Sequence, residues 1–397
     1  MVRKTPKAIT WSEVLDLERA FFNVHSDFYG DWYRDPWGWP EIKWLSEKRP
    51  DLVVDRLDNQ RFGQVSLLDV PKENFGTRPA VILDPVDRLA YQALVDCISV
   101  KLIGGLSDSA FGWRLNRSDP KPGKYHSNGE EQKRYRRHIE MFGGHWQMAG
   151  LKTDVVSFFA NIDVPALVER VYQEAGSGAV PKSLEAMLLN WDSNASRTGI
   201  PQRASASSVL ANFYLMPLDD AVLRELPHFK PPGKDVFRTL GEHMAVLDRG
   251  STSRWMDDVW IFGRDASSLR KTQYDIESIL RELGLDMNIA KTDVLEGDDL
   301  HSEILRFEHS AVDGALMGDP KDVGPLEDLV RELVNDPEHR SRSSFKFALR
   351  RLRDHDVYEQ IDDLVGIAAR APHAADASYN RMLWMLGRLK GATYPPV

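Results

Sequence analysis

Three aspartates carry the strongest chemical signal in the sequence, and two of them are adjacent. Asp257 and Asp258 have apolar residues on both sides, as a pair of short strands would supply. Adjacent side chains within one regular strand point to opposite faces, so we place the pair at the tip of a tight hairpin, where both carboxylates can converge. Asp154 stands about 100 residues earlier, after a short predicted strand. Carboxylates alone form the hard, all-oxygen kind of site that Mg²⁺ prefers.

The elements that must position these carboxylates can be predicted from the surrounding pattern. Residues 150–300 alternate short apolar strands with amphipathic helices, which predicts an α/β or α+β body. Upstream, Val65–Val70 and Arg78–Leu83 have the composition of strands, and Pro85 opens a predicted helix. Downstream, an Asp-Gly pair between two apolar runs predicts a hairpin over 303–316.

The C-terminal part, after Pro325, is predicted to be helical throughout. Phe345, Leu349 and Leu352 share one apolar face of a helix. Beside them six cations occur within fourteen residues that contain no acid, and a solvated face would mix both signs. We therefore favour nucleic-acid contact for this stretch. The cations are Arg340, Arg342, Lys346, Arg350, Arg351 and Arg353.

Composition limits what the whole chain can be. Its 397 residues predict two or three domains. A protein that coats nucleic acid without sequence preference would be basic, whereas this chain has a net charge of −9, so any binding to nucleic acid must use local basic patches. Residues 114–138 form one candidate patch, with eight cations against three anions, where phosphate contact and a solvated loop both stay open. Cys97 is the single cysteine, which excludes internal disulfides and thiolate zinc sites. No signal peptide or membrane-spanning run is found, and we expect a cytoplasmic protein without a membrane partner.

An aromatic segment over residues 11–48 has two interpretations. It is rich in Trp, Tyr and Phe, and helical spacing is visible at Leu15, Leu17, Phe21 and Phe22. We favour a helical cap packed on the core over a platform on which bases stack.

Several stretches, taken together, resemble the reverse-transcriptase family. Each could occur by chance, but their order and spacing along residues 60 to 310 are specific. They are 78–94 (RPAVILDPVDRLAYQAL), 111–115 (FGWRL), 154–163 (DVVSFFANID), 199–215 (GIPQRASASSVLANFYL), 255–258 (WMDD) and 284–292 (GLDMNIAKT).

The resemblance implies a right-hand polymerase fold and RNA-directed DNA synthesis with two Mg²⁺ ions, for which Mn²⁺ is a possible substitute. An aromatic N-terminal extension (1–49) would precede the fingers (50–150), a palm (151–310) with the aspartates and a primer-grip hairpin, and a helical thumb (311–397). RNA template, DNA product and dNTPs would be its partners, and a homo-oligomer is left open.

The resemblance also assigns roles to individual residues. Catalysis falls to Asp154, Asp257, Asp258 and Lys291, the last of which would protonate the leaving pyrophosphate. The metal ions fall to Asp154, Val155, Asp257 and Asp258. The incoming nucleotide falls to Lys72, Arg78, Phe159 and Gln202, with Phe159 as the gate against a 2′-hydroxyl. Nucleic-acid contact falls to Arg203, Arg342, Lys346, Arg350 and Arg353.

Two positions depart from the family pattern. Trp255 replaces a tyrosine or phenylalanine before the aspartates, and Arg203 replaces a glycine after Gln202. Together with the compact chain, they favour the bacterial defence-associated group, including abortive-infection enzymes, over the retron and intron enzymes. That group implies antiphage defence with a dedicated non-coding RNA as template. Template-independent DNA synthesis and a non-catalytic RNA-binding scaffold are the alternatives.

Overall fold

The computed structural model divides the chain into two compact units, which are described separately. One unit combines Met1–Leu67 with Val81–His301, and the other combines Leu68–Ala80 with Ser302–Val397. The structure describes residues 10–28, 31, 38–71, 76–116, 118–119, 121–143, 149–193, 199–223, 252–305, 324–335, 337, 342–354, 366–367 and 369–389.

A five-stranded sheet, in the order β3-β5-β6-β4-β7, forms the centre of the first unit. β3 runs parallel to β5, and the other neighbours are antiparallel. Together with the helices around it, this sheet confirms the predicted mixed α+β class. The strands are β3 (Ala110–Phe111), β4 (Ala149–Thr153), β5 (Thr252–Trp255), β6 (Asp258–Gly263) and β7 (Asp293–Glu296).

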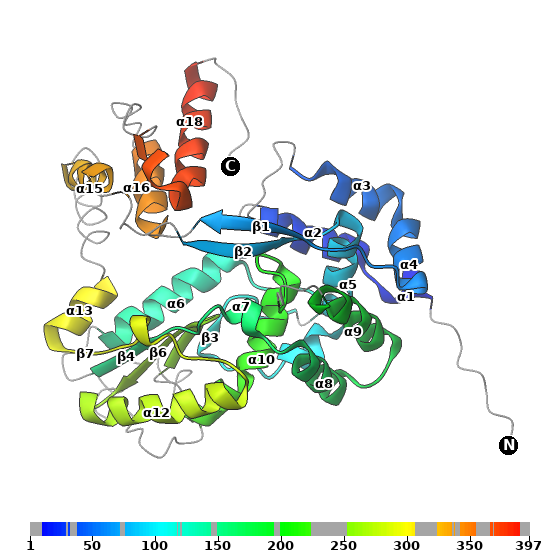
Figure 1. Cartoon of the computed structure of the whole chain (residues 1–397), viewed down its shortest axis with the longest axis horizontal. Helices are drawn as coiled ribbons and strands as arrows, with labels where there is room; N and C mark the ends of the chain where they lie inside the picture. The colour runs from blue at the N-terminus through cyan, green and yellow to red at the C-terminus, as the bar shows by residue number, and fades with distance from the viewer. Residues whose placement is uncertain are drawn as a thin grey trace, which may run out of the picture. The chain divides into compact units, whose positions relative to one another are not determined.

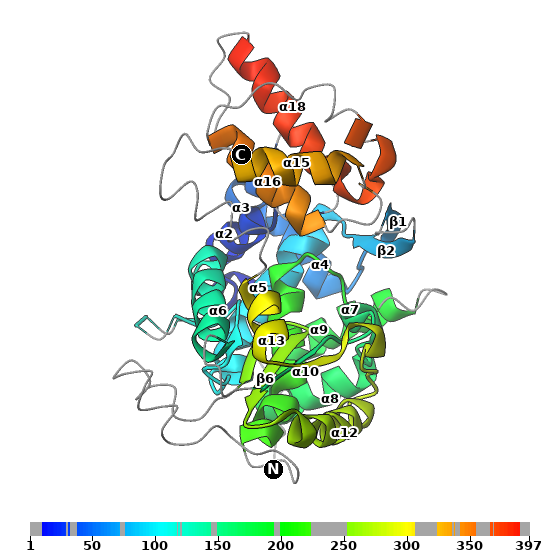
Figure 2. The ribbon, with the colours of Figure 1, turned by 90° about the vertical axis from the view of Figure 1, so that its left-hand side faces the viewer.

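Helices cover the sheet and extend the core of this unit (Figures 1 and 2). α12 (Ala266–Glu282) packs on β4, β6 and β7, whereas α6 (Asn128–Gly143) packs on β3, β5 and β6. A Cβ on Gly150 of β4 would lie 2.6 Å from Cδ1 of Leu300, so the glycine lets that leucine pack closely on the strand. The other helices are α1 (Trp11–Val14), α2 (Leu17–Asp27), α3 (Pro40–Lys48), α4 (Pro50–Asn59), α5 (Pro85–Ile103), α7 (Phe158–Asn161), α8 (Val164–Ala175), α9 (Ala179–Asp192), α10 (Ser205–Leu223), the 3₁₀ turn η4 (Ile289–Lys291) and α13 (Gly297–Leu305).

In the described part of the aromatic N-terminal segment, helices pack on this core, as the favoured interpretation predicted, while Tyr29, Trp32, Tyr33 and Trp37 lie outside the described residues. Trp11 and Trp39 are buried, and α2 and α3 both contact α5. Phe22 and Trp44 are exposed, and each lies beneath the guanidinium of a neighbouring arginine. Most of the segment's described aromatic surface is therefore used for packing.

The second unit has its own apolar core, to which three helices contribute. The predicted stripe of Phe345, Leu349 and Leu352 is buried in it. The helices are α15 (Gly324–Asn335), α16 (Arg342–Asp354) and α18 (Ala375–Leu389), with the 3₁₀ turn η5 (Pro372–Ala374) before the last. A two-stranded sheet of β1 (Ser66–Pro71) and β2 (Thr77–Ile82) spans the boundary between the units and confirms the two predicted strands.

The hairpin predicted over 303–316 is wrong at its start. Ile304 and Leu305 form the last turn of α13 instead of a strand, and residues 306–316 lie outside the described part of the chain. A run of four apolar and polar residues fits a helix end as well as a strand, so its composition alone could not separate the two.

Among the described helices, none combines the length and apolar character that crossing a bilayer requires.

Candidate active site

The tip of the β5–β6 hairpin carries the adjacent aspartates, as predicted. The last strand pair is Trp255 with Asp258, so Met256 and Asp257 form a two-residue turn. Met256 has a φ of 56°, a left-handed conformation that usually needs glycine at the first position of such a turn. The backbone at this tip is therefore strained, and the side chain of Met256 is buried beneath it.

The register of the sheet brings the third aspartate to the same place. β4 pairs with β6 from Ala149↔Gly263 to Thr153↔Val259. One further residue along this register sets Asp154 opposite Asp258 and beside the turn. Asp154 is buried, Asp257 is half-buried and Asp258 is exposed. The structure thus brings together the three carboxylates that sequence spacing singled out.

The charges of Asp154 and Asp258 affect the pKa of Asp257. Burial, and then the charges of Asp258 and Asp154, raise the pKa of Asp257 to about 7. Burial and like charges held close together both disfavour the ionised form of a carboxyl group. The three side chains therefore form one cluster of carboxyl groups, and a bound cation would stabilise their ionised form.

The segment around η4 supplies two donors to this cluster. Asn288 Nδ2 and Lys291 Nζ both lie 3.0 Å from the same oxygen of Asp154, Oδ2. The backbone N–H of Asn288 also donates to the Asp154 carbonyl at 2.8 Å. Burial lowers the pKa of Lys291, but the hydrogen bond to Asp154 and the charges of the three carboxylates raise it by more, so the net shift of this pKa is upward.

The pairing next to Asp154 also orients Val155. Val155 forms an isolated antiparallel bridge with Met287, flanked by hydrogen bonds from Asn288 N–H and Val156 N–H. In this kind of pair the bridged residues direct their own N–H and C=O groups away from each other's strand. The Val155 carbonyl therefore lies on the β6 side, where the aspartates are.

The donor set fits an oxygen-liganded divalent ion in its chemistry. Carboxylate and backbone carbonyl oxygens are what Mg²⁺ takes, together with water and substrate phosphates. In the described part of the chain, however, no three His, Cys, Asp or Glu side chains already stand in a metal-binding arrangement. The carboxylates would have to adjust around an ion, and Mg²⁺ stays a prediction.

The predicted nucleotide gate lies on a helix beside this cluster. Phe158 is buried in the core, whereas Phe159 is half-buried, so Phe159 is the residue of the pair that keeps exposed surface. The N–H of Ile200 donates to the Phe159 carbonyl at 3.0 Å. A Cβ on Gly199 would stand 2.2 Å from that oxygen, so only glycine permits this contact. The loop that carries Gln202 is thereby fixed against α7.

Arg203 stands in a conformation that explains the glycine of the family pattern. Its φ is 64°, which costs a residue with a Cβ more than it costs glycine. Arg88 Nη2 donates to the Arg203 carbonyl at 3.1 Å. Arg88 also pairs with Asp31 and lies 4.2 Å above the Trp39 ring. Arg88 of α5 thus links this loop to Asp31 and Trp39 of the N-terminal segment.

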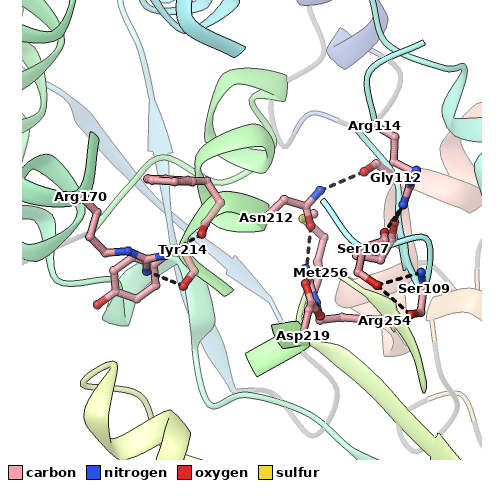
Figure 3. Close-up of polar contacts among 12 residues, drawn as sticks. Ser107, Ser109, Gly112, Arg114, Arg170, Asn212, Tyr214, Asp219, Arg254 and Met256 are labelled. Atoms are coloured by element: carbon pink, nitrogen blue, oxygen red, sulfur yellow. Dashed lines mark hydrogen bonds and ion pairs between the residues drawn. The ribbon is translucent and has the colours of Figure 1, made fainter. Parts of the chain in front are cut away.

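An interaction network that the sequence did not reveal supports the hairpin from below (Figure 3). Arg254 is fully buried and forms a two-point ion pair with Asp219 at 2.8 and 2.6 Å. Its Nη1 donates to Asn212 Oδ1 at 2.9 Å and to the Met256 carbonyl at 3.2 Å. Asn212 in turn donates to the Gly112 carbonyl at 2.9 Å. The strained turn is therefore tied to α10.

A proline inside α10 accounts for a second arginine in the same view (Figure 3). Pro217 has no N–H and leaves the Phe213 carbonyl without its helical donor. Arg170 donates to that oxygen at 3.0 Å and to the Tyr214 carbonyl at 2.7 Å. The guanidinium thus supplies the hydrogen-bond donor that the proline removes from the helix.

Trp255, next to the turn of the hairpin, packs into an aromatic cluster. Its ring lies 6.0 Å from that of Trp113 and 5.8 Å from that of Tyr135, measured between centroids. A Cβ on Gly112 would approach the Trp255 ring to 3.3 Å, and the φ of Gly112 is 79°. This packing connects the FGWRL stretch to the aspartates.

The remaining predicted residues lie elsewhere or outside the description. Arg78 lies on β2 and is half-buried, and Lys72 falls outside the described residues. Arg342 begins α16, Lys346 and Arg353 are partly exposed, and Arg350 is exposed.

Half of the cations in the basic segment 114–138 have described side chains, and these form ion pairs within the protein. Arg114 is buried and pairs with Asp108 and Glu131. Arg134 also pairs with Glu131, and Lys124 pairs with Asp119. Arg117 lies outside the described residues, as do the side chains of Lys133, Arg136 and Arg137. These contacts favour a structural role for the cations that the structure describes.

Comparisons with known proteins add little to this geometry. No protein-family model matches the chain, and no curated protein matches it. Among solved structures it is similar to apo telomerase from Candida tropicalis, with 9% sequence identity and a TM-score of 0.37, over 88% of this chain and 69% of that chain. That likeness is too distant to bear on the chemistry of the site.

Proposed function

We propose that this chain is an RNA-directed DNA polymerase that uses Mg²⁺. The observation that carries the proposal is the meeting of Asp154 with Asp257 and Asp258 at one end of the sheet, where the pKa of Asp257 rises to about 7. Supporting it, the other family-like stretches lie around the same point: Gly199 against Phe159, and Gly112 against Trp255.

Each residue of the cluster has a role in this proposal. Asp154, Asp257, Asp258 and the Val155 carbonyl hold the metal. Bound Mg²⁺ would supply activation of a primer 3′-hydroxyl and neutralise charge on the leaving pyrophosphate.

The incoming nucleotide is bound by a second set of residues. Phe159 excludes a ribose 2′-hydroxyl by its bulk, and Gln202 lies against the nucleotide. Arg78 and Lys72 bind the triphosphate, for which the planar guanidinium of Arg78 is suited. Lys291 donates a proton to pyrophosphate.

Template and biological role rest on the family resemblance alone. We propose a dedicated non-coding RNA as template, cytoplasmic antiphage defence as the role, and template–primer contact by Arg203 and by Arg342, Lys346, Arg350 and Arg353. Arg203 also favours a second candidate, template-independent DNA synthesis, because a long cation stands where glycine would leave room for a template strand.

A primer-extension assay tests the proposal. Purified protein, an RNA template with an annealed DNA primer, dNTPs and Mg²⁺ should yield template-length DNA. Asp257→Ala should lower the rate at least about 1,000-fold, since it removes a metal ligand. Asp58→Ala, on an exposed part of α4, is the matched control and should extend the primer normally.

The other candidates predict different products. If the protein synthesises DNA from a single dNTP without RNA, its activity is template-independent DNA synthesis and not the templated reaction. A chain that binds RNA but extends nothing, with Asp257→Ala retaining biological activity, would be a scaffold and would contradict the proposal.

A further inference from the structure

Two side chains from one short segment bind the same oxygen of Asp154, and they differ in how firmly they are held. Asn288 Nδ2 and Lys291 Nζ each lie 3.0 Å from Oδ2. We infer that Lys291 is an exchangeable counter-cation of the carboxylate cluster, which leaves Asp154 when a divalent ion binds, whereas Asn288 stays and orients the carboxylate. This inference rests on the proposed metal site at Asp154.

Asn288 is fixed on several sides. Its backbone N–H donates to the Asp154 carbonyl at 2.8 Å, and its own carbonyl accepts from the Thr292 hydroxyl at 2.8 Å. Thr292 is in turn bonded to the hydroxyl of Thr153 on β4, also at 2.8 Å. These bonds fix the backbone of Asn288 beside Asp154, and its short side chain keeps the amide within reach of the carboxylate.

Lys291 is free to move by comparison. About two-thirds of its side chain is exposed (66%), whereas the side chain of Asp154 is 11% exposed. A lysine has a flexible four-carbon stem, so its ammonium can swing into solvent without any change in the core. The ion pair is therefore the part of the arrangement that can be given up.

An ammonium and a divalent ion compete for the Asp154 carboxylate. A metal ion held by this carboxylate would repel the positive charge of the ammonium, which lies 3.0 Å from Oδ2. Without an ion, the same ammonium offsets the negative charge of Asp154. Lys291 thus stabilises the ion-free state and competes with metal binding.

The exchange also has a consequence for the proposed reaction. Once released from Asp154, the ammonium remains tethered within the length of a lysine side chain of the cluster. It then becomes available to a phosphate group of the nucleotide. Metal binding would therefore come first and would make the proton donor available second.

Direct measurement of Mn²⁺ binding tests this. Free Mn²⁺ is quantified by electron paramagnetic resonance during titration of the full chain, with no nucleotide or nucleic acid. Lys291→Gln should bind Mn²⁺ about two- to fivefold more tightly than the wild type, the range expected from losing a largely exposed ion pair. Lys182→Gln removes the same charge from an exposed position on α9 and should leave the affinity unchanged.

Conservative and site variants make the outcome decisive. Lys291→Arg keeps a competing cation and should bind Mn²⁺ as the wild type does. Asp154→Asn should weaken binding at least about tenfold, and its thermal unfolding shows whether it is folded. Equal or weaker binding in Lys291→Gln overturns the inference, because a competing cation must lower affinity.

The same titration separates the two proposals. If Asp154→Asn has no effect on Mn²⁺ binding, the metal site is not at this cluster, and both the inference and the proposed function are overturned. If Lys291→Gln tightens binding while the wild type synthesises no DNA, the counter-cation role is supported and the polymerase is not.

Discussion

At the scale of single residues, the aspartates depend on a buried cation behind them. Arg254 carries a full charge in the interior, and it is stable there because Asp219, Asn212 and the Met256 carbonyl accept its hydrogen bonds. A left-handed methionine in a two-residue turn is unfavourable on its own. The bond from Arg254 to its carbonyl offsets part of that cost and holds Asp257 in place.

Replacing Arg254 should therefore be costly for stability. Arg254→Met leaves the largely buried Asp219 carboxylate without its partner, and we expect the free energy of unfolding to fall by about 3–5 kcal/mol. Urea denaturation followed by circular dichroism measures this. Arg281→Met breaks an ion pair with Glu277 in which the arginine is 67% exposed, and should change stability by less than about 0.5 kcal/mol. Similar losses in both variants would show that Arg254 supports nothing in particular.

At the level of single residues, the sequence predicted the residues that carry the chemistry better than it predicted the residues that hold them in place. Asp257 and Asp258 are weak evidence alone, because most adjacent aspartates lie in surface turns, and they stood out through the family-like stretches around them. Arg254 did not, since an arginine near aspartates looks like a surface partner of those same aspartates. Its real partners come from α10, and Asn212 lay unassigned within a stretch already recognised as family-like. Only the fold brings them together.

At the scale of elements, the N-terminal helices control where α10 begins. Asp27, the last residue of α2, accepts hydrogen bonds from Ser205 N–H at 2.9 Å and from Ser205 Oγ at 2.5 Å. Ser205 is the first residue of α10 and follows the loop with Gln202 and Arg203. Burial raises the pKa of Asp27 to about 7, although Arg88 and the bonds from Ser205 oppose the shift.

This contact should make stability depend on pH. The pKa of Asp27 is higher in the folded chain than the value of 3.8 it starts from, so the folded state binds the extra proton. Stability from this group is therefore present at low pH and is lost as pH rises from about 4 to about 7. Asp27→Asn stays neutral, and its melting temperature should exceed that of the wild type at pH 8 but not at pH 4.5.

Thermal unfolding at several pH values checks this. Asp58→Asn, on the exposed side of α4, is the control and should follow the wild type at every pH. A constant difference between Asp27→Asn and the wild type would show that Asp27 does not titrate in this range.

Elements defined by local pattern were predicted well, and those defined by distant pairing were not. The β5–β6 hairpin, β4 and the helix from Pro85 follow from short-range signals, and the structure confirms them. The parallel pairing of β3 with β5 joins residues more than 100 positions apart, so nothing local specifies it. Ile304 was wrongly assigned to a strand because the helix that contains it is fixed by a distant contact, Leu300 on Gly150.

At the scale of the whole molecule, the second unit contributes a separate basic surface. Phe345, Leu349 and Leu352 anchor α16 in that unit's core, whereas Arg350 is exposed and Lys346, which faces α18, is partly exposed. Lys346 lies 3.8 Å from Asp376, and Arg350 lies 3.9 Å from Asp354. These are long, exposed contacts of little energetic worth, so both cations can exchange them for phosphate.

Neutralising both cations should change how RNA binding responds to salt. Each phosphate contact contributes about 0.7–0.9 to the slope of log affinity against log salt. Lys346→Gln with Arg350→Gln should therefore flatten that slope by about 1.5 and weaken binding to a structured RNA, measured by fluorescence anisotropy between 50 and 300 mM salt. The matched control, Lys182→Gln with Arg281→Gln, removes the same charge from exposed helices of the first unit and should keep the slope. If the salt slope flattens by the same amount in both double variants, net charge alone governs RNA binding, and α16 has no specific role in it.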